Sequence, residues 1–406
     1  MRILFLKQLF HPEPTARSLD FAIELSKHGH DVQVLTGFPS YPKGEIYEGY
    51  QQNLFFREVI QGIDVIRVPI YPDQSGRAIH RILNYMSFAV TAILLGLPRV
   101  TKPDVVFAYH GALPVGLPAI LYKWIRGVPF VYDINDIWPD TLVATGMLKN
   151  KLLLNTVNRW CKFTYKMAAH ITVLSGGFRD TLIRRGVGPN KVTFINQWSR
   201  NEEIDPSSID SSINRHFKKE EFNILYAGNL GKAQSLRSVI RAFKELQDDY
   251  PQLFFTLLGD GVERKELILF VKDSKIKNVR FIDRVDSDEV AKYLHSADVL
   301  LVHLKDDPLF RITIPSKIIG CHQAGKPILL GIKGDAEGVI KASKAGFIFE
   351  PDNITDLKEK IVMLLSLPKH ELQKMGENGL RYYNKHFTIG TNTEHFLQIF
   401  IKVKKK

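Results

Sequence analysis

The segment VYDINDIWPD at residues 131–140 holds the densest group of side chains that could do chemistry. An apolar run ends there and is followed by Asp133, Asp136 and Asp140, with Asn135 among them. A carboxylate can hold a sugar hydroxyl or accept its proton, although Asp and Asn side chains also simply cap loops. We predict that this group recognises or activates a hydroxyl, and that Asp136 is its catalytic member.

A second candidate is the glycine-containing turn AGNLGKAQS at 227–235. Gly228 and Gly231 would let the backbone approach a ligand closely, and a helix beginning near Ser235 would offer unpaired N–H groups to an anion. Lys232 would add a positive charge. We predict a phosphate site here; the alternative is a tight strand-to-helix turn with a solvated lysine.

The turn LLGDGVER at 257–264 also follows an apolar run, with glycines at Gly259 and Gly261. Arg264 stands where a dinucleotide-binding fingerprint needs its third glycine, so a nicotinamide cofactor is disfavoured. A plain turn between strand and helix is the alternative to a ligand site.

Lys317 is the strongest single phosphate candidate. Pro315 and Ser316 fit the start of a helix, which puts Lys317 in the first helical turn. A cation beside the positive end of a helix is unfavourable unless an anion binds there. The alternative is an exposed lysine without a ligand.

The run RVDSDEV at 284–290 contains closely spaced carboxylates, but a metal site is not the favoured interpretation. Asp286 can cap a helix, with Glu289 completing a capping-box-like pair. Near the N-terminus, FHPEPTARS at 10–18 places Arg17 at the entrance of a helix, where it could hold an anion.

Short apolar runs that alternate with helical patterns must position these residues. Near-continuous apolar runs such as DVVFAY at 104–109 are typical of strands buried on both faces. Strands are expected at 2–8, 31–37, 63–70, 104–110, 129–135, 170–175 and 191–196, and again at 222–229, 254–261, 279–285, 298–304, 327–332 and 346–350. This alternation predicts two doubly wound α/β domains in series, with ligands at the carboxyl ends of the strands and a cleft between the domains.

The polar run at 197–221 is the best linker candidate. We place an N-terminal domain at 1–200, a C-terminal domain at 201–385, and a helix with a basic tail at 386–406 that could pack back on the first domain. Residues 369–400 look helical, and the chain closes with a cationic tail at Lys402–Lys406.

The hydrophobic content, net charge and cysteine count exclude several classes of protein. The 406 residues are 45% hydrophobic and 24% charged, which is ordinary for a globular protein and excludes wholesale disorder. The formal net charge of +12 favours an anionic partner. Only two cysteines occur, so a disulfide framework is excluded and a cytoplasmic location is expected.

The segment 74–103 contains Arg77, Arg81, Arg99 and Lys102 and no acidic residue. Between the arginines, 82–97 is mostly apolar but too short and too interrupted for a confident membrane span. A buried core helix is one interpretation, and a cationic, apolar face lying on an anionic membrane is the other.

Taken together, DINDIWPD, GNLGKAQS, GDG and the run from PSK to AGKP resemble family-4 retaining glycosyltransferases of the GT-B fold. The closest resemblance is to the bacterial branch that builds O-antigen, capsule and colanic acid, including L-fucosaminyltransferase-like members. It covers essentially the whole chain.

The resemblance implies transfer of a sugar, with retention, from a nucleotide-diphosphate donor to a lipid-pyrophosphate-linked saccharide at the inner membrane face. A UDP-linked donor is expected. No metal or other cofactor is normally required in this fold, and no nucleic-acid partner is expected. The donor site would comprise Gly228, Asn229, Lys232, Gln234, Gly259, Arg284, Ser316 and Lys317. The acceptor site would comprise Thr15, Arg17 and Asn135, with Asp136 catalytic.

The sequence departs from the family pattern at several of these positions. Asn229 and Gln234 replace a usual arginine and lysine, and Asn135 replaces a usual histidine. The carboxylates of the family's EX7E motif map to Ile312 and Gly320, so both are absent. A nucleotide-sugar epimerase of the same fold and a non-catalytic assembly scaffold therefore remain as alternatives.

Overall fold

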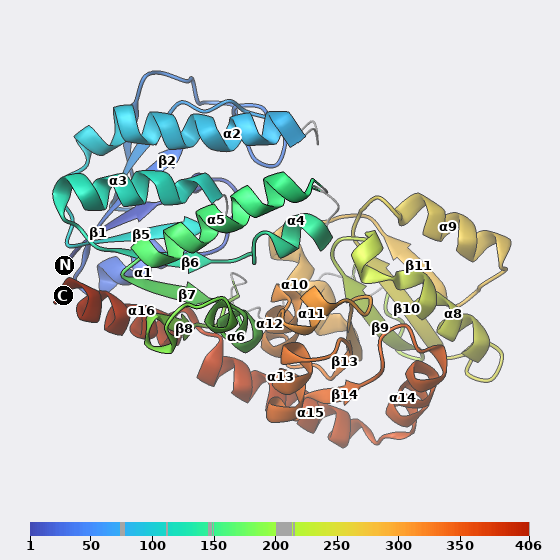
Figure 1. Cartoon of the computed structure of the whole chain (residues 1–406). Coiled ribbons are helices and arrows are strands. Elements are labelled where there is room, and N and C mark those ends of the chain that lie inside the picture. The colour runs from blue at the N-terminus through green and yellow to red at the C-terminus, as the bar shows by residue number, and fades with distance from the viewer. Residues whose placement is uncertain are drawn as a thin grey trace. The chain divides into compact units, whose positions relative to one another are not determined.

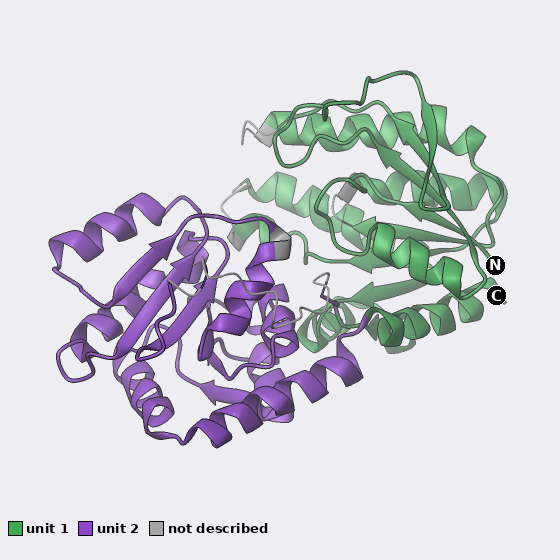
Figure 2. Ribbon diagram, turned by 180° about the vertical axis from the view of Figure 1, so that it is seen from behind, with its two compact units in different colours: residues 1–196, 389–406 green, residues 197–388 purple. Residues whose placement is uncertain are grey.

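The computed structural model describes residues 1–73, 78–110, 113–144, 148, 150–199, 213 and 216–405. The chain forms two compact units (Figure 2). Unit 1 consists of residues 1–196 together with 389–406, and unit 2 consists of residues 197–388. The domain boundaries predicted from the sequence are at residues 200 and 385.

Unit 1 contains an eight-stranded sheet in the order β3-β4-β2-β1-β5-β6-β7-β8. Its strands are β1 (Arg2–Leu6), β2 (Asp31–Gly37), β3 (Phe56–Ile60), β4 (Ile63–Val68), β5 (Val105–His110), β6 (Phe130–Ile134), β7 (His170–Val173) and β8 (Val192–Phe194). All neighbours pair in parallel except β3, which pairs antiparallel with β4 at the edge. The strand order reverses between β1 and β5.

Helices cover both faces of this sheet. They are α1 (Leu19–Lys27), α2 (Ala78–Thr91), α3 (Gly116–Arg126), α4 (Asp140–Ala144), α5 (Lys151–Met167), α6 (Gly176–Arg184) and α16 (Ile389–Lys404). Because parallel crossovers are right-handed, the connection from β1 to β2 puts α1 on one face. The connections from β4 to β5, from β5 to β6 and from β6 to β7 cross the sheet in the opposite direction. They therefore put α2, α3 and α5 on the opposite face (Figure 1).

Unit 2 contains a six-stranded parallel sheet in the order β11-β10-β9-β12-β13-β14. Its strands are β9 (Phe222–Ala227), β10 (Leu253–Leu258), β11 (Val279–Ile282), β12 (Val299–His303), β13 (Ile328–Gly331) and β14 (Gly346–Ile348). Its helices are α8 (Leu236–Leu246), α9 (Arg264–Asp273), α10 (Ser287–Ser296), α11 (Pro308–Arg311), α12 (Ser316–Gln323), α13 (Asp335–Ser343), α14 (Ile354–Ser366) and α15 (Lys369–His386).

The strands are buried on both faces, as their apolar runs predict. β6 and β12 are buried at every position. In unit 2, alternate residues of the same strand enter different clusters: Leu225 belongs to one, and Ile224 and Tyr226 belong to the other. The prediction of two doubly wound α/β domains is confirmed.

The end of the chain is helical as expected. Residues 369–400 lie in α15 and α16 apart from Phe387 and Thr388, and the C-terminal helix expected from residue 386 is α16, which begins at Ile389. The edge strand β3 was not predicted, because its side chains are mostly exposed and its sequence FREVI lacks a buried apolar run.

Candidate active site

The strand order in unit 2 reverses between β9 and β12, which is where open α/β sheets bind ligands. The loop 228–235 follows β9, and α12 follows β12 after a short connection. The predicted donor residues on these two segments therefore share one edge of one sheet: Gly228, Asn229, Lys232, Gln234, Ser316 and Lys317. Gly259 and Arg284 follow the neighbouring strands β10 and β11.

Lys317 reaches from the first turn of α12 to the end of β9. Its Nζ lies 3.8 Å from the centre of the Tyr226 ring and donates a hydrogen bond to the Tyr226 hydroxyl. A Cβ at Gly228 would lie 2.5 Å from Cε of Lys317. The glycine at 228 therefore leaves room for the lysine side chain.

The environment of Lys317 favours its uncharged form. Burial lowers the pKa of Lys317 to about 7, and no carboxylate among the described residues forms an ion pair with it. A bound anion would stabilise the ammonium and raise this pKa again. The lysine is therefore suited to respond to a negatively charged ligand. Ser316 precedes it as the first residue of α12 and is exposed.

Hydrogen bonds between uncharged amide groups join the two ends of the loop 228–235. Gln234 Oε1 accepts hydrogen bonds from Asn229 Nδ2 at 3.3 Å and from the backbone N–H of Gly231 at 3.1 Å. Lys232 is exposed at the start of a short 3₁₀ turn, and α8 begins just beyond it at Leu236. In this loop Lys232 supplies the only positive charge.

Gly259 is required by packing between two loops. Its φ is +138°, and a Cβ there would lie 2.1 Å from the carbonyl oxygen of Gly228. The two loops are further joined because the N–H of Leu230 donates to the carbonyl of Asp260 at 2.8 Å. They line a cavity of about 520 Å³ together with Arg284 and Asp286.

The prediction that Asp286 caps α10 is only half right. Asp286 occupies the N-cap position, but its side chain makes no hydrogen bond to the first turn. It is exposed and lines the cavity just described. Among the described residues, no group of three His, Cys, Asp or Glu side chains is arranged to hold a metal ion.

In unit 1 the structure separates the three carboxylates of the DINDIWPD segment. Asp136 is exposed at the end of β6, and the atoms around its carboxyl raise its pKa by desolvation. Asp140 forms an ion pair with Arg185. Asp133 is fully buried and accepts a hydrogen bond from Thr172 Oγ1 at 2.6 Å. The expectation that none of these carboxylates serves packing was wrong for Asp133.

The assignment of Arg17 to an anion site was also wrong. Its side chain is fully buried and forms an ion pair with Asp133. Its other terminal nitrogen donates to the carbonyl of Ile195 at 3.0 Å. Arg17 therefore ties the end of β6 to the segment after β8, and its guanidinium is not exposed to a ligand.

The other two predicted acceptor residues are half-buried near these groups. Asn135 Nδ2 donates to Asp133 Oδ2 at 3.1 Å. The hydroxyl of Thr15 accepts a hydrogen bond from the buried Lys7 and donates to the carbonyl of Leu9, both at 3.3 Å. Both side chains thus have local partners, and their acceptor role stays a prediction.

Sequence reasoning missed Tyr226 and His110. Tyr226 looked like one more apolar strand residue, because only the fold brings Lys317 onto its ring. His110 ends β5, beside the reversal of strand order in unit 1. It is buried, neither ring nitrogen has a hydrogen-bond partner among the described residues, and burial lowers its pKa to about 3.

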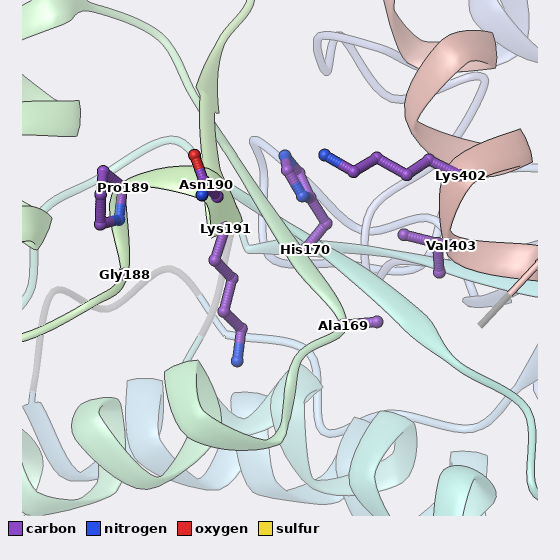
Figure 3. Close-up of a pocket in the computed structure, with 8 residues that line it drawn as sticks. All are labelled: Ala169, His170, Gly188, Pro189, Asn190, Lys191, Lys402 and Val403. Atoms are coloured by element: carbon purple, nitrogen blue, oxygen red, sulfur yellow. The ribbon is translucent and has the colours of Figure 1, made fainter.

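A separate cavity of about 370 Å³ lies in unit 1 at the amino ends of β7 and β8 (Figure 3). It is lined by Ala169, His170, Gly188, Pro189, Asn190, Lys191, Lys402 and Val403. The predicted acceptor residues lie at the carboxyl ends of the strands, so this cavity is not the candidate site.

Within the predicted segment 74–103, α2 (Ala78–Thr91) is followed by a π-helical turn over Ala92–Gly96 and a 3₁₀ turn over Leu97–Arg99. Arg77 lies outside the described residues. From Ile79 to Arg99 the helix is long and apolar enough to cross a membrane, and only 33% of its apolar window is buried. The helix therefore packs one side on the core, where Phe88, Ala89 and Ala92 are buried, and exposes its other side.

Comparison with known proteins assigns a family to each half of the chain. Residues 14–198 match the glycosyl transferase 4-like domain, and residues 208–382 match the glycosyl transferases group 1 domain. A similar curated protein is the putative colanic acid biosynthesis glycosyl transferase WcaI of Escherichia coli (strain K12). It is 25% identical over 85% of this chain and 87% of its own length.

Solved structures extend the likeness to the whole fold. Anabaena Alr3699/HepE in complex with UDP and glucose has a TM-score of 0.69 at 17% identity, over 99% of both chains. WaaG, a glycosyltransferase involved in lipopolysaccharide biosynthesis, has a TM-score of 0.64 at 16% identity, over 98% of this chain and 99% of its own. With a 4-like domain followed by a group 1 domain, the chain is a glycosyltransferase of the two-domain GT-B fold.

Proposed function

We propose that this protein transfers a sugar from a UDP-linked nucleotide-diphosphate donor to a lipid-pyrophosphate-linked saccharide. The reaction belongs to bacterial surface polysaccharide synthesis and proceeds with retention at the anomeric carbon. Unit 2 binds the donor and unit 1 binds the acceptor. No metal or other cofactor takes part.

The observation that carries this proposal is the position of Lys317. It stands at the reversal of strand order in unit 2, against Tyr226 and Gly228, without a carboxylate partner among the described residues. A diphosphate leaving group needs a cation there, because negative charge develops as the glycosidic bond breaks. Lys317 is suited to that task, since an anion would restore its charge.

The chemistry assigns one task to each unit. Lys317 and the N–H groups of the loop 228–235 stabilise the departing diphosphate. The acceptor hydroxyl oxygen forms the new bond to the anomeric carbon, and Asp136 holds that hydroxyl or receives its proton. Asn229 and Gln234 contribute polar contacts where relatives use charge.

The surface-polysaccharide setting is supported by the relatives. WcaI is named for colanic acid biosynthesis, and WaaG is described as involved in lipopolysaccharide biosynthesis. The HepE structure holds UDP and glucose, which supports a UDP-linked donor. The acid-free segment 77–102 supports peripheral attachment at the inner membrane face.

A panel of nucleotide sugars, incubated with and without a lipid-linked saccharide, tests the proposal. Release of nucleoside diphosphate only when acceptor is present supports transfer, and the anomeric configuration of the product tests retention. Formation of an isomer without acceptor would instead identify an epimerase of the same fold. The absence of turnover, combined with retained assembly of partner enzymes, would identify a scaffold.

A further inference from the structure

Three helices of unit 1 form one continuous outer layer. The crossovers place α2, α3 and α5 on the same face of the sheet, and α3 contacts both of its neighbours (Figure 1). Their outward side chains therefore face the same solvent. We call the exposed side of α2, α3 and α5, with the helical turns that extend α2 to Arg99, the three-helix face.

The three-helix face exposes large apolar side chains on all three helices. On α3, Trp124 and Ile125 are 60% and 71% exposed, and on α5, Leu152 is 75% exposed. The complete set is Ile79, Ile82, Leu83, Met86, Val90, Leu94, Trp124, Ile125, Leu152, Leu153 and Phe163. Along α2 these residues recur every three or four positions, which puts them on one side of the helix. An apolar surface of this extent is typical of an interaction site.

The charge on this face has a single sign. None of the residues 79–99, 116–126 and 151–167 is Asp or Glu. Exposed cations are interleaved with the apolar side chains at Arg126, Lys151, Arg159, Lys162 and Lys166. On α5, Leu152, Arg159, Phe163 and Lys166 return to one side of the helix at intervals of seven, four and three positions.

We infer that the three-helix face docks on a lipid bilayer with anionic headgroups. Apolar side chains enter the boundary between headgroups and acyl chains, while the surrounding lysines and arginines bind phosphate-bearing headgroups. Charge complementarity favours this occupant over a second copy of the chain, because two copies of an acid-free cationic face would repel each other. The docking surface thus extends well beyond the segment 77–102, with α3 and α5 contributing most of its exposed cations.

This inference rests on the proposed function for its purpose, since a lipid-linked acceptor requires the enzyme to work at a membrane. Its evidence is separate, because it comes from exposure and charge in unit 1, whereas the donor site is in unit 2. The two can therefore fail independently.

Vesicle sedimentation of the full chain tests the inference. The vesicles contain phosphatidylcholine alone or an equal mixture with anionic phosphatidylglycerol. Two α5 variants remove apolar contact (Leu152→Gln with Leu153→Gln) or charge (Arg159→Gln with Lys162→Gln). Because each basic residue near an anionic surface adds to the binding energy, the charge variant is expected to lower the partition coefficient for anionic vesicles about tenfold. The apolar variant should lower it as well.

Matched variants in unit 2 control for loss of any exposed residue. Leu269→Gln with Met363→Gln removes exposed apolar side chains, and Lys265→Gln with Lys272→Gln removes exposed cations. These variants should partition as the unchanged protein does. Each variant should keep the far-UV circular dichroism spectrum and the thermal unfolding midpoint of the unchanged protein, which shows that it is folded. UDP affinity in calorimetry should be unchanged, because the proposed donor site is in unit 2.

The inference is overturned if the α5 variants partition onto anionic vesicles like the unchanged protein. It is also overturned if the unit 2 control variants lose as much vesicle binding as the α5 variants, or if the protein binds neutral vesicles as well as anionic ones. It is also overturned if the α5 variants convert a dimer to a monomer in light scattering, since the face would then bind a second copy. Vesicle binding without any UDP binding would refute the proposed function and leave the docking surface intact.

Discussion

Lys317 shows how one side chain can sense a ligand through its own ionisation. It rests on the aromatic ring of Tyr226, and burial has lowered its pKa to about 7. A diphosphate beside it would favour the ammonium and raise the pKa. If the nucleotide binds here, as we propose, its binding is linked to uptake of a proton by Lys317.

This linkage predicts the pH dependence of nucleotide affinity. Below pH 7 the ammonium is already formed and affinity is greatest, whereas above pH 7 binding must first protonate the amine and affinity falls. Calorimetry with UDP between about pH 7 and about pH 9, in buffers of different ionisation heat, measures both the affinity and the proton uptake.

Lys317→Met should weaken UDP binding by about 10- to 100-fold, because charge-assisted hydrogen bonds contribute about 1.5–3 kcal/mol. It should also abolish the proton uptake. Lys232→Met, which removes an exposed cation of the neighbouring loop, should retain the uptake. An equal pH dependence in Lys317→Met and the unchanged protein would contradict the assignment.

Asp136 is predicted to act on the acceptor and not on the donor. Asp136→Asn should reduce turnover about 10²- to 10⁴-fold, the usual range for a lost general base, and leave UDP affinity unchanged. Because desolvation raises the pKa of Asp136, the rate should fall on the acid side at a higher pH than an ordinary Asp would give. Asp140→Asn, which only breaks an ion pair with Arg185, should keep near-normal turnover. A larger loss of turnover in Asp140→Asn than in Asp136→Asn would refute the choice of Asp136.

At the scale of the elements, buried ionic contacts hold the strand ends of unit 1 in place. Arg17 joins the segment after β1 to Asp133 at the end of β6 and to the carbonyl of Ile195 beyond β8. Arg17 also adopts a left-handed backbone conformation, with φ of +49°, which is unfavourable for a side chain with a Cβ. The pair therefore fixes the framework from which Asp136 projects.

Asp133→Ala should destabilise unit 1 by about 3–5 kcal/mol, because it leaves the Arg17 guanidinium buried without its carboxylate. Denaturant unfolding followed by tryptophan fluorescence measures the loss. Asp180→Ala removes an exposed ion pair with Arg179 and should cost no more than about 1 kcal/mol. Equal losses for the two variants would show that the buried pair is unimportant.

The loops of unit 2 pack too closely for a side chain at Gly259. In Gly259→Ala the new Cβ would overlap the carbonyl oxygen of Gly228, which must displace the loop 228–235. We expect a destabilisation of about 1–3 kcal/mol together with a loss of UDP affinity. Gly338→Ala, where a Cβ meets nothing within 4 Å on α13, should leave UDP affinity unchanged and should not lower stability, because Ala favours a helix more than Gly does. Normal UDP affinity in Gly259→Ala would separate this glycine from the site.

At the scale of the whole molecule, the last helix of the chain belongs to the first unit. Phe396 of α16 packs on Phe21 and Phe107, with ring centres 4.9 and 5.5 Å apart. The guanidinium of Arg17 lies 4.8 Å from the centre of the Phe396 ring. Unit 2 is therefore an insertion into the sequence of unit 1, and the C-terminal helix supports the Arg17–Asp133 pair.

Phe396→Ala should destabilise unit 1 by about 3–5 kcal/mol, the usual cost of truncating a buried Phe. Hydrogen exchange resolved by peptide should show faster exchange in β1, β5 and α1 and unchanged exchange in unit 2. Ile401→Ala, at an exposed position of the same helix, should change stability by no more than about 0.5 kcal/mol. Uniform destabilisation of both units would contradict the assignment of α16 to unit 1.

The sequence predicted those features that depend on local pattern. Buried parallel strands leave apolar runs, and the start of α12 at Ser316 follows from Pro315 before it. The sequence could not reveal that Arg17 meets Asp133, or that Lys317 meets Tyr226, because strand order joins residues 116 and 91 positions apart. The sequence also cannot distinguish Arg17 and Asp133, which form a buried ion pair, from an exposed carboxylate such as Asp136, because both arrangements use the same residue types.

Crystals of the full chain soaked with UDP would show where the nucleotide binds. We expect density for the diphosphate within hydrogen-bond distance of Lys317 Nζ and beside the loop 228–235, at the carboxyl ends of β9 and β12. Density confined to the cavity around His170, Lys191 and Lys402, or no density in unit 2, would contradict this expectation.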